Sequence, residues 1–476
     1  MQVSSFVLAH DEVHDIQDDN CVRSMRSHRC IQPLRRATSP HSKSKTMPFK
    51  KYYLLLACGL GLAAPAIYAD TPLTPAKSPI AAVAATQSLP PARVTATLAD
   101  YQRWLDQLAE RNAVAGLATA VVVNDKVVFE RSVGYADAAT KQPVTPDTVF
   151  RLASLSKAFA TALAGLLVQD GKLSWDTRLV DVLPYFKLKD AKAGADATVS
   201  DILGQRLGLP RNTYDSMLEG EIPYEELVRK LDEVDMACGV GQCYGYQNVA
   251  FGMIGDIVLA RTGDFFYRLV DKRIFYPLGM RTASYGLAAL ESSQSWARPH
   301  RPSAHGWIPF EPTETYYRVA PAAGVNASLH DMEKWLVAQM GGHTDVLPPS
   351  LLDVLHAPGV ATPTELRATP WRSARLKSAY YALGWRVYDY GGETLIYHAG
   401  AVAGYRTMIG FFPKYHAGVV TLWNSTGPVP SGLMPMVFDG LLGLPHVDWA
   451  DIEGSTTSAA ATPKKKGTSK SGHRKH

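Results

Sequence analysis

The pattern of hydrophobic and polar positions places strand-like segments towards both ends of the chain. Ala118 to Val123 and Lys126 to Phe129 are apolar runs on either side of Asn124-Asp125, which predicts two strands joined by a tight turn. Strand-like runs return late in the chain, at residues 383–388, 394–397, 407–412 and 418–423. We therefore expect strands from both ends to meet in one antiparallel sheet.

Helical periodicity dominates between these two groups of strands. Residues 98–112 carry apolar positions at helical spacing, and a broad apolar face runs from Leu155 to Leu167 and stops at Gly171. Further helices are predicted at residues 200–203, 224–231, 251–261, 330–340 and 434–442, and residues 286–320 indicate a long surface loop. The fold class is therefore α+β, with a sheet built from both chain ends, flanking helices and a mostly helical region.

The first 69 residues have the features of a secretory signal preceded by an extension. Met47 is followed by two lysines, an apolar stretch and small residues, which predicts a signal peptide over 47–69 with cleavage near Ala69. We expect residues 1–46 to be a misassigned start or a disordered extension, so His10 and His14 are not taken as a metal pair. Lipidation at Cys58 is the second choice. The apolar stretch is too short for a stable membrane span.

Composition sets the remaining boundaries. Residues 70–95, rich in Ala, Pro, Thr and Ser, predict a linker, residues 96–447 a single folded domain, and residues 448–476 a disordered basic tail. The net charge of +5 comes from the two ends, and the body between them is mildly acidic, so we expect no nucleic-acid partner. We expect a periplasmic or secreted monomer.

Five cysteines are present, and two of them, Cys238 and Cys243, fall in the predicted domain. They lie close together in the sequence, and the signal peptide implies an oxidising compartment. A disulfide that closes this short loop is plausible, and two free thiols remain the alternative.

A nucleophile and a candidate base occur together where the central apolar helix begins. Ser154 and Lys157 are three residues apart, which places them on one face of a helix. A serine hydroxyl becomes a nucleophile when a neighbouring base takes its proton, and a lysine can be that base if burial lowers its pKa. The motif alone is weak, because Ser42 and Lys45 repeat it without an apolar helix behind them.

Two further segments offer matching chemistry. Tyr246-Gln247-Asn248 supplies a phenol and a carboxamide on an irregular segment before a helix. His398-Ala399-Gly400 ends a predicted strand, and Gly400 would let a substrate carbonyl lie close to the strand backbone. The chain has no Gly-x-Ser-x-Gly and no His-Glu-x-x-His motif, and we expect no metal and no cofactor.

In this order and spacing, the three segments resemble the motifs of the serine β-lactamase and penicillin-binding protein superfamily, most closely the class C β-lactamase-like branch with its D-Ala-D-Ala carboxypeptidase and esterase relatives. The flanking segments are also similar, and the resemblance covers residues 96–447. The flanking segments that carry this similarity are Phe150-Arg-Leu-Ala-Ser154, Leu207-Gly-Leu-Pro210, Ile274-Phe-Tyr-Pro-Leu-Gly-Met280, Ala322-Ala-Gly-Val-Asn326 and Leu383-Gly-Trp385.

The resemblance implies a β-lactamase/transpeptidase-like fold and a role for each matching residue. Ser154 would be acylated, and Lys157 and Tyr246 would share the proton transfers, with Tyr246 activating water. Asn248 would hold an amide of the acyl group. The backbone N–H groups of Ser154 and Ala401 would form the oxyanion hole.

Two departures from the family pattern affect the choice of substrate. His398 stands where class C β-lactamases usually carry lysine, and Gln205-Arg206-Leu207 stands where relatives often have His-Thr-Ser. A histidine is not always charged near neutral pH, which makes carboxylate recognition less certain. The expected function is acyl transfer from β-lactams or D-amino-acid peptides of the peptidoglycan type to Ser154 and then to water. The alternatives are a carboxylesterase on the same site and a penicillin-binding or sensor protein that does not turn over.

Overall fold

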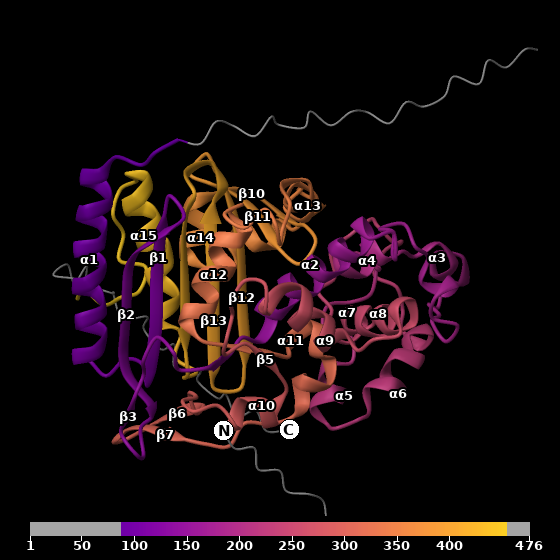
Figure 1. Ribbon diagram of the computed structural model, residues 1–476, viewed down its shortest axis with the longest axis horizontal. Coiled ribbons are helices and arrows are strands. Elements are labelled where there is room, and N and C mark those ends of the chain that lie inside the picture. Colours follow the sequence, from indigo (N-terminus) through magenta and orange to yellow (C-terminus); the bar gives the residue numbers. More distant parts are fainter. Residues whose placement is uncertain (1–86, 455–476) are drawn as a thin grey trace, which may run out of the picture. The chain divides into compact units, whose positions relative to one another are not determined.

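A nine-stranded antiparallel sheet organises the structure, a computed structural model that describes residues 87–454 (Figure 1). The strand order is β3-β2-β1-β14-β13-β12-β11-β10-β9, so β1 from the first part of the chain pairs with β14 from its end. The expected sheet built from both chain ends is confirmed. The strands are β1 (Gly116–Val123), β2 (Lys126–Asp137), β3 (Gln142–Pro143), β9 (Val360–Ala361), β10 (Leu376–Tyr381), β11 (Arg386–Tyr390), β12 (Glu393–Val402), β13 (Tyr405–Phe412) and β14 (Ala417–Trp423).

Successive side chains along each strand point to opposite sides of the sheet, and a hydrophobic core covers each of its two faces. In β1, Ala118 and Val122 belong to one hydrophobic core, whereas Leu117 and Val121 belong to the other. The first core lies against α12 and the helical region, and the second lies against α1 and α15. A strand buried on both faces has no polar alternation, as the wholly buried β1 shows.

Helices make up both outer layers and most of the region beside the sheet, as Figure 1 shows. Their bounds are α1 (Pro91–Glu110), α2 (Ser156–Gln169), α3 (Ala191–Asp196), α4 (Val199–Leu203), α5 (Asp215–Glu219), α6 (Tyr224–Arg229), α7 (Val249–Gly252), α8 (Ile254–Thr262), α9 (Phe266–Val270), α10 (Leu287–Glu291), α11 (Ala320–Ala323), α12 (Leu329–Gln339), α13 (Pro349–Leu355), α14 (Pro370–Arg375) and α15 (Leu433–Leu442). Two small sheets accompany them, β4 (Phe150–Arg151) with β5 (Ser284–Tyr285) and β8 (Val325–Ala327), and the hairpin of β6 (His300–Ser303) and β7 (Gly306–Pro309).

Helix α2 is the central helix of the molecule. Its residues 156–167 are all buried, since a helix that is apolar around most of its circumference needs neighbours on every side. Phe159 stacks on Trp335 of α12 with ring centroids 4.0 Å apart. Gly171 follows the helix with a φ of +68°, a left-handed conformation that suits glycine and ends the helix where the sequence predicts.

The predicted linker and tail are both too long. Helix α1 begins at Pro91, so the linker prediction is wrong for residues 91–95, and a proline in the first turn suits a helix start. At the other end, Ala450 and Ile452 are buried in the second core, and Trp104 Nε1 donates to Glu453 Oε1 at 2.5 Å. The ordered domain therefore extends past residue 447 on the strength of these contacts.

Three further details differ from the predicted elements. Strand β11 begins at Arg386, because Gly384 adopts a φ of +74° in the turn before it. Strand β12 continues to Val402, so His398 lies inside the strand and does not end it. The segment expected to be one long loop contains α10 and the β6–β7 hairpin.

The predicted signal peptide, the extension before it and Cys58 lie outside the described residues. Within residues 87–454, no helix is long and apolar enough to cross a membrane.

Candidate active site

Ser154 lies in a tight 3-10 turn, Ala153–Leu155, that leads directly into α2. Ala153 has a φ of +52°, a left-handed conformation that costs an L-residue about 1–2 kcal/mol. Neighbouring hydrogen bonds hold the turn: Thr407 Oγ1 donates to Leu152 O at 2.8 Å, and Ser156 Oγ donates to Ala153 O at 2.6 Å. Strain held in place by its surroundings is typical of functional sites.

Gly400 lets β12 approach this turn closely. A Cβ at Gly400 would lie 2.3 Å from Thr407 Oγ1 and 2.4 Å from Leu152 O, so only glycine lets β12 pass this close to the turn. This packing is a second reason for glycine at this position, and the expected approach of a substrate carbonyl stays a prediction. Its neighbours Ala399 and Ala401 line the pocket in front of Ser154.

Lys157 is completely buried one turn after Ser154. Its Nζ donates to Asn248 Oδ1 at 2.7 Å and to Ala322 O at 3.0 Å. Burial lowers the pKa of Lys157 to about 7, although the carboxylate of Asp215 acts in the opposite direction. A neutral amine has two N–H groups and one lone pair, and these two acceptors use both N–H groups. The lone pair of Lys157 therefore remains for a proton.

Tyr246 is a neutral phenol in this pocket. Burial raises the pKa of Tyr246 to about 12, while a hydrogen bond with Ser154 acts in the opposite direction. Its ring centroid lies 4.6 Å from Lys157 Nζ. A phenolate form is therefore disfavoured near neutral pH, which leaves Lys157 as the stronger base of the pair.

Asn248 links Lys157 to an acidic residue that the sequence analysis missed. Its Nδ2 donates to Asp215 Oδ2 at 2.7 Å, while its Oδ1 accepts from Lys157. Burial raises the pKa of Asp215, and the bond from Asn248 opposes this. Asn248 retains one N–H for a substrate. Nothing in the spacing of Asp215 from the three motifs singles it out.

His398 is buried and neutral. Its Nδ1 lies 2.9 Å from Ala399 O, a carbonyl that can only accept, so this nitrogen carries the proton and Nε2 accepts from the Tyr381 hydroxyl at 3.3 Å. Burial, Arg386 and Lys157 all hold the pKa of His398 well below its usual range. The position at which class C β-lactamases usually carry lysine therefore adds no positive charge here.

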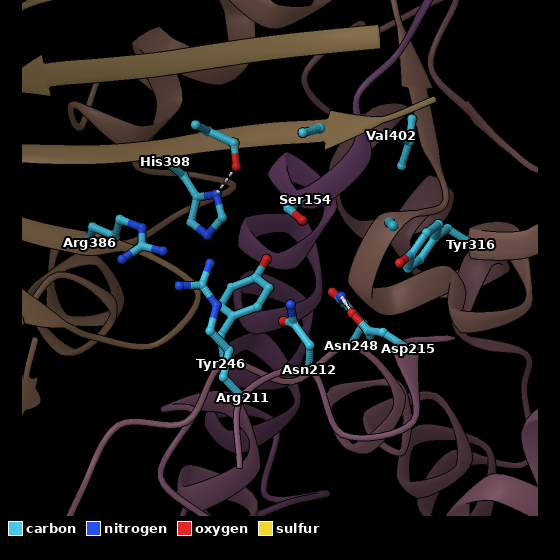
Figure 2. A pocket seen from close by; sticks show the side chains of 13 residues that line it. Ser154, Arg211, Asn212, Asp215, Tyr246, Asn248, Tyr316, Arg386, His398 and Val402 are labelled. Atoms are coloured by element: carbon cyan, nitrogen blue, oxygen red, sulfur yellow. Dashed lines mark hydrogen bonds between the residues drawn. The ribbon is translucent and has the colours of Figure 1, made fainter. Parts of the chain in front are cut away.

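Two arginines that the sequence analysis missed supply positive charge instead. Figure 2 shows Arg211 and Arg386 on the His398 side of the pocket, whereas Asn248 and Asp215 lie on the other side. Arg386 Nη2 donates to Tyr244 Oη at 3.1 Å. Its Nη1 lies 2.9 Å from Glu365 Oε1 without being aligned to donate a hydrogen bond. The cavity between these sides has a volume of about 290 Å³.

The departure at Gln205 has a structural role. Gln205 Oε1 accepts from the backbone N–H of Gln247 at 2.5 Å, and its Nε2 donates to Gln247 O at 3.0 Å. This pair of bonds fixes the backbone between Tyr246 and Asn248. Arg206 points elsewhere, with its Nε donating to Asp201 Oδ1 at 2.7 Å.

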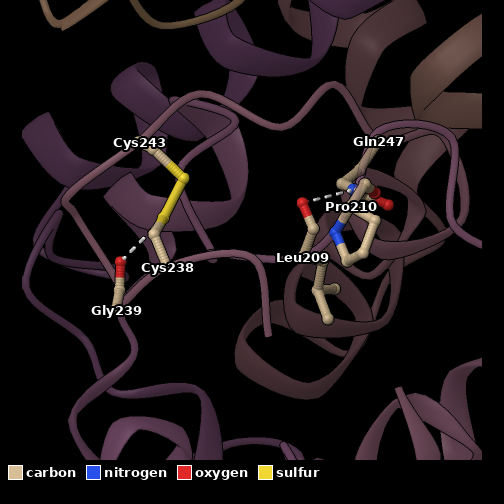
Figure 3. Close-up of a disulfide and its surroundings, with 6 residues drawn as sticks. All are labelled: Leu209, Pro210, Cys238, Gly239, Cys243 and Gln247. Atoms are coloured by element: carbon tan, nitrogen blue, oxygen red, sulfur yellow. Dashed lines mark hydrogen bonds between the residues drawn. A yellow bond between two sulfur atoms is a disulfide. The ribbon is translucent and has the colours of Figure 1, made fainter. Parts of the chain in front are cut away.

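A disulfide closes the loop that leads to Tyr246. Figure 3 shows Cys238 bonded to Cys243, with Leu209 and Gln247 nearby. The backbone N–H of Gly245 donates to Gln205 O at 2.9 Å, so this loop and the Tyr246 segment share one anchor.

The Beta-lactamase family model matches residues 101–435, which include all three motifs. The chain belongs to the Beta-lactamase family. Within it, the chain is similar to the unguisins hydrolase ungD' of Aspergillus campestris, with 27% identity over 69% of this chain and 61% of that protein. It is also similar to the protein flp of Staphylococcus aureus, with 24% identity over 68% of this chain and 63% of that protein.

These matches have a stated extent. The chain spans less than two thirds of the length of ungD' and of flp. Among solved structures, the octameric penicillin-binding protein homologue from Pyrococcus abyssi superposes with a TM-score of 0.64 and 23% identity, covering 73% of this chain and 77% of that one. This likeness confirms the expected β-lactamase/transpeptidase-like α+β fold of the domain.

Proposed function

We propose that this protein is a serine hydrolase that works through an acyl-enzyme on β-lactams or D-amino-acid peptides. The observation that carries the proposal is the state of Lys157. Its amine is buried one turn after Ser154, has a pKa near 7, and uses both neutral N–H groups on Asn248 and Ala322. An amine in that state can accept the serine proton near neutral pH.

In acylation, Ser154 Oγ forms a bond to the substrate carbonyl carbon while its proton passes to the lone pair of Lys157. Tyr246, as a phenol in contact with Ser154, donates its proton to the leaving nitrogen and is reprotonated by the Lys157 ammonium. The backbone N–H groups of Ser154 and Ala401 would bind the developing oxyanion, each contributing about 3–4 kcal/mol to transition-state stabilisation.

In deacylation, the same groups work in reverse. Water bonds to the acyl carbon and loses its proton through Tyr246 to neutral Lys157, and the bond to Ser154 Oγ breaks with return of a proton to that oxygen. Asn248 would bind an amide of the acyl group through its remaining N–H.

The cationic side of the pocket supports an anionic substrate. Because His398 is neutral, Arg386 and Arg211 are the positive groups that line this side. Both arginines line the pocket, and a guanidinium suits a substrate carboxylate of the kind that β-lactams and peptide C-termini carry. A carboxylesterase remains the second candidate, favoured by the absence of lysine at position 398. The relative named a hydrolase supports turnover over a sensor that stays acylated.

A substrate panel tests the proposal. Nitrocefin, a D-Ala-D-Ala peptide and a short-chain nitrophenyl ester would be compared by kcat/KM, with Ser154→Ala as the control. We expect one of the two carboxylate-bearing substrates to exceed the ester. A higher value for the ester would make the protein a carboxylesterase, and a permanent mass increase after penicillin without release would make it a sensor.

We also propose a periplasmic or secreted location and a monomeric state. The disulfide between Cys238 and Cys243 supports an oxidising compartment.

A further inference from the structure

One oxygen of a buried carboxylate on α12 lacks a hydrogen-bond partner. Glu333 is only 7% exposed, and its Oε1 has no donor within reach among the described residues. Burying an unpaired carboxylate is costly, so such groups are paired or coordinate a metal. Glu333 therefore needs a positively charged neighbour or a proton.

The atoms around Glu333 are ligand atoms. His330, one turn earlier on α12, and Glu130 on β2 approach it, and one ligand atom from each of the three residues lies within 4.8 Å of the others. His330 Nε2 is 3.0 Å from Glu130 Oε2. Two carboxylates and one imidazole thus converge where a helix meets an outer strand of the sheet.

A fourth residue orients the imidazole. Asp147 Oδ1 lies 2.8 Å from His330 Nδ1, so a proton on Nδ1 is held by this carboxylate. With the proton on Nδ1, loss of the Nε2 proton leaves a lone pair directed towards Glu130 Oε2, 3.0 Å away, where a metal ion could bind. A carboxylate that fixes the far nitrogen of a histidine is a common outer contact of histidine ligands to metal ions.

We propose that Glu130, His330 and Glu333 bind one divalent transition-metal ion of the Zn²⁺ type, with Asp147 orienting His330. One nitrogen and two carboxylate oxygens are ligands that Zn²⁺ accepts, and a fourth position would be open to water. A cleft of about 670 Å³, lined by His330 and Glu333 among others, gives an ion access. Without a metal ion, a proton shared between Glu130 and Glu333 would have to offset the repulsion between their two carboxylates.

The site is separate from the catalytic pocket and would act on stability. None of its four residues lines the pocket of Ser154. Because its ligands come from β2 and α12, a bound ion would tie the outer part of the sheet to the helix that packs on it. An ion that binds the folded chain alone stabilises it by mass action.

Zinc titration of the full chain tests the proposal. After chelator treatment and dialysis, Zn²⁺ binding would be measured by calorimetry and by metal content. Histidines elsewhere in the chain can also bind zinc. Each variant is therefore compared with the unaltered chain by the number of zinc ions bound per chain. We expect His330→Asn and Glu333→Gln each to lose one bound Zn²⁺ per chain, together with the rise in Tm that zinc gives the unaltered protein. His446→Asn is the matched control, since His446 Nε2 also contacts a glutamate, Glu453, at 2.6 Å.

Folding of the variants is checked by their Tm without metal. Glu333→Gln keeps the size of the side chain and removes a carboxyl group that is costly to ionise when buried, so it should fold at least as well as the unaltered chain. Glu130→Gln changes a partly exposed side chain and serves as the second variant. Unchanged zinc stoichiometry in both glutamate variants, or equal loss in His446→Asn, would overturn the proposal, as would zinc displacement by Mg²⁺ at equal concentration.

Discussion

The two sides of the Ser154 pocket differ in how their charges are paired. On one side, Asp215 and Asn248 form a buried chain of hydrogen bonds to Lys157. On the other side, Arg386 and Arg211 face the cavity (Figure 2). Arg386 Nη1 is buried 2.9 Å from Glu365 Oε1. The first side is a chain of hydrogen bonds that ends at Lys157, whereas the second side carries the two positive charges that line the pocket.

In the proposed function, this difference separates chemistry from recognition. A base needs a fixed position and a shifted pKa, which burial and the Asn248 contact provide for Lys157. A binding group for an anion needs positive charge at the cavity, which Arg211 and Arg386 provide. Mutations on the two sides should therefore affect kcat and substrate choice differently.

The largest expected effect is at the nucleophile between the two sides. Ser154→Ala should lower kcat by about 10⁴-fold or more, because no covalent intermediate can form, while the Tm stays within a few degrees. Steady-state kinetics and thermal unfolding measure both. Ser292→Ala, at an exposed position, is the control and should be fully active. Turnover retained by Ser154→Ala would remove the nucleophile from the account.

The pH dependence of activity tests the side of the pocket that Asp215, Asn248 and Lys157 form. Because burial lowers the pKa of Lys157 to about 7, the amine is protonated and inactive below this value, and kcat/KM should rise about tenfold per unit as pH approaches 7 from below and level off above it. Lys157→Met should abolish this rise along with most activity. A rise centred above pH 9.5 would show that Lys157 is not the base.

The lowered pKa of Lys157 also predicts that the free energy of unfolding changes with pH. Its pKa in the folded chain lies below the unfolded value of 10.5, so the unfolded chain binds more protons between about pH 7 and 10.5. This term therefore makes the folded state more stable as pH rises through that window. Lys157→Met should raise the Tm at pH 6 by more than at pH 10, as thermal unfolding can measure. Equal shifts at both pH values would contradict the lowered pKa.

For the side of the pocket that carries Arg211 and Arg386, we expect mutation to change the choice of substrate. Arg386→Gln should raise KM for a carboxylate-bearing substrate by about 10–100-fold, the value of a charged hydrogen bond, and leave ester hydrolysis within twofold. Arg372→Gln is a matched control, because Arg372 also pairs with Glu365 but does not line the pocket. Equal losses for both substrates in Arg386→Gln would mean that the arginine is structural.

His398→Lys should have the smallest effect. A lysine there adds a charge beside Arg386 and should shift kcat/KM towards carboxylate-bearing substrates by at most about tenfold. The ratio of kcat/KM for the peptide and the ester measures it. An unchanged ratio would exclude position 398 from carboxylate binding.

The sequence predicts the scaffold of this site better than its recognition side. Strands from both ends, the central helix after Ser154 and the segment of Tyr246 follow from local periodicity and turn residues. Asp215 and Arg386 do not, because they reach the pocket through long-range packing. Arg386 lies opposite Tyr397 in the pairing of β11 with β12, which places the start of β11 beside the strand that carries His398.

The same limit explains the errors. His398 was placed at a strand end because Ala399-Gly400 suggests a break, whereas the glycine lets β12 pass the Ser154 turn. The ligand atoms of the proposed metal site come from residues 130, 330 and 333, and the first is too far from the other two in the sequence for a local motif to predict the site. Contacts between distant segments are absent from any local pattern.

The central claim is that Ser154 carries the acyl group. Tyr246→Phe should slow deacylation, so rapid quenching after substrate addition and mass analysis of the digested protein should show the acyl mass on the peptide that contains Ser154. The double variant Ser154→Ala/Tyr246→Phe should show none. An acyl mass on a different residue, or on the double variant, would contradict the account.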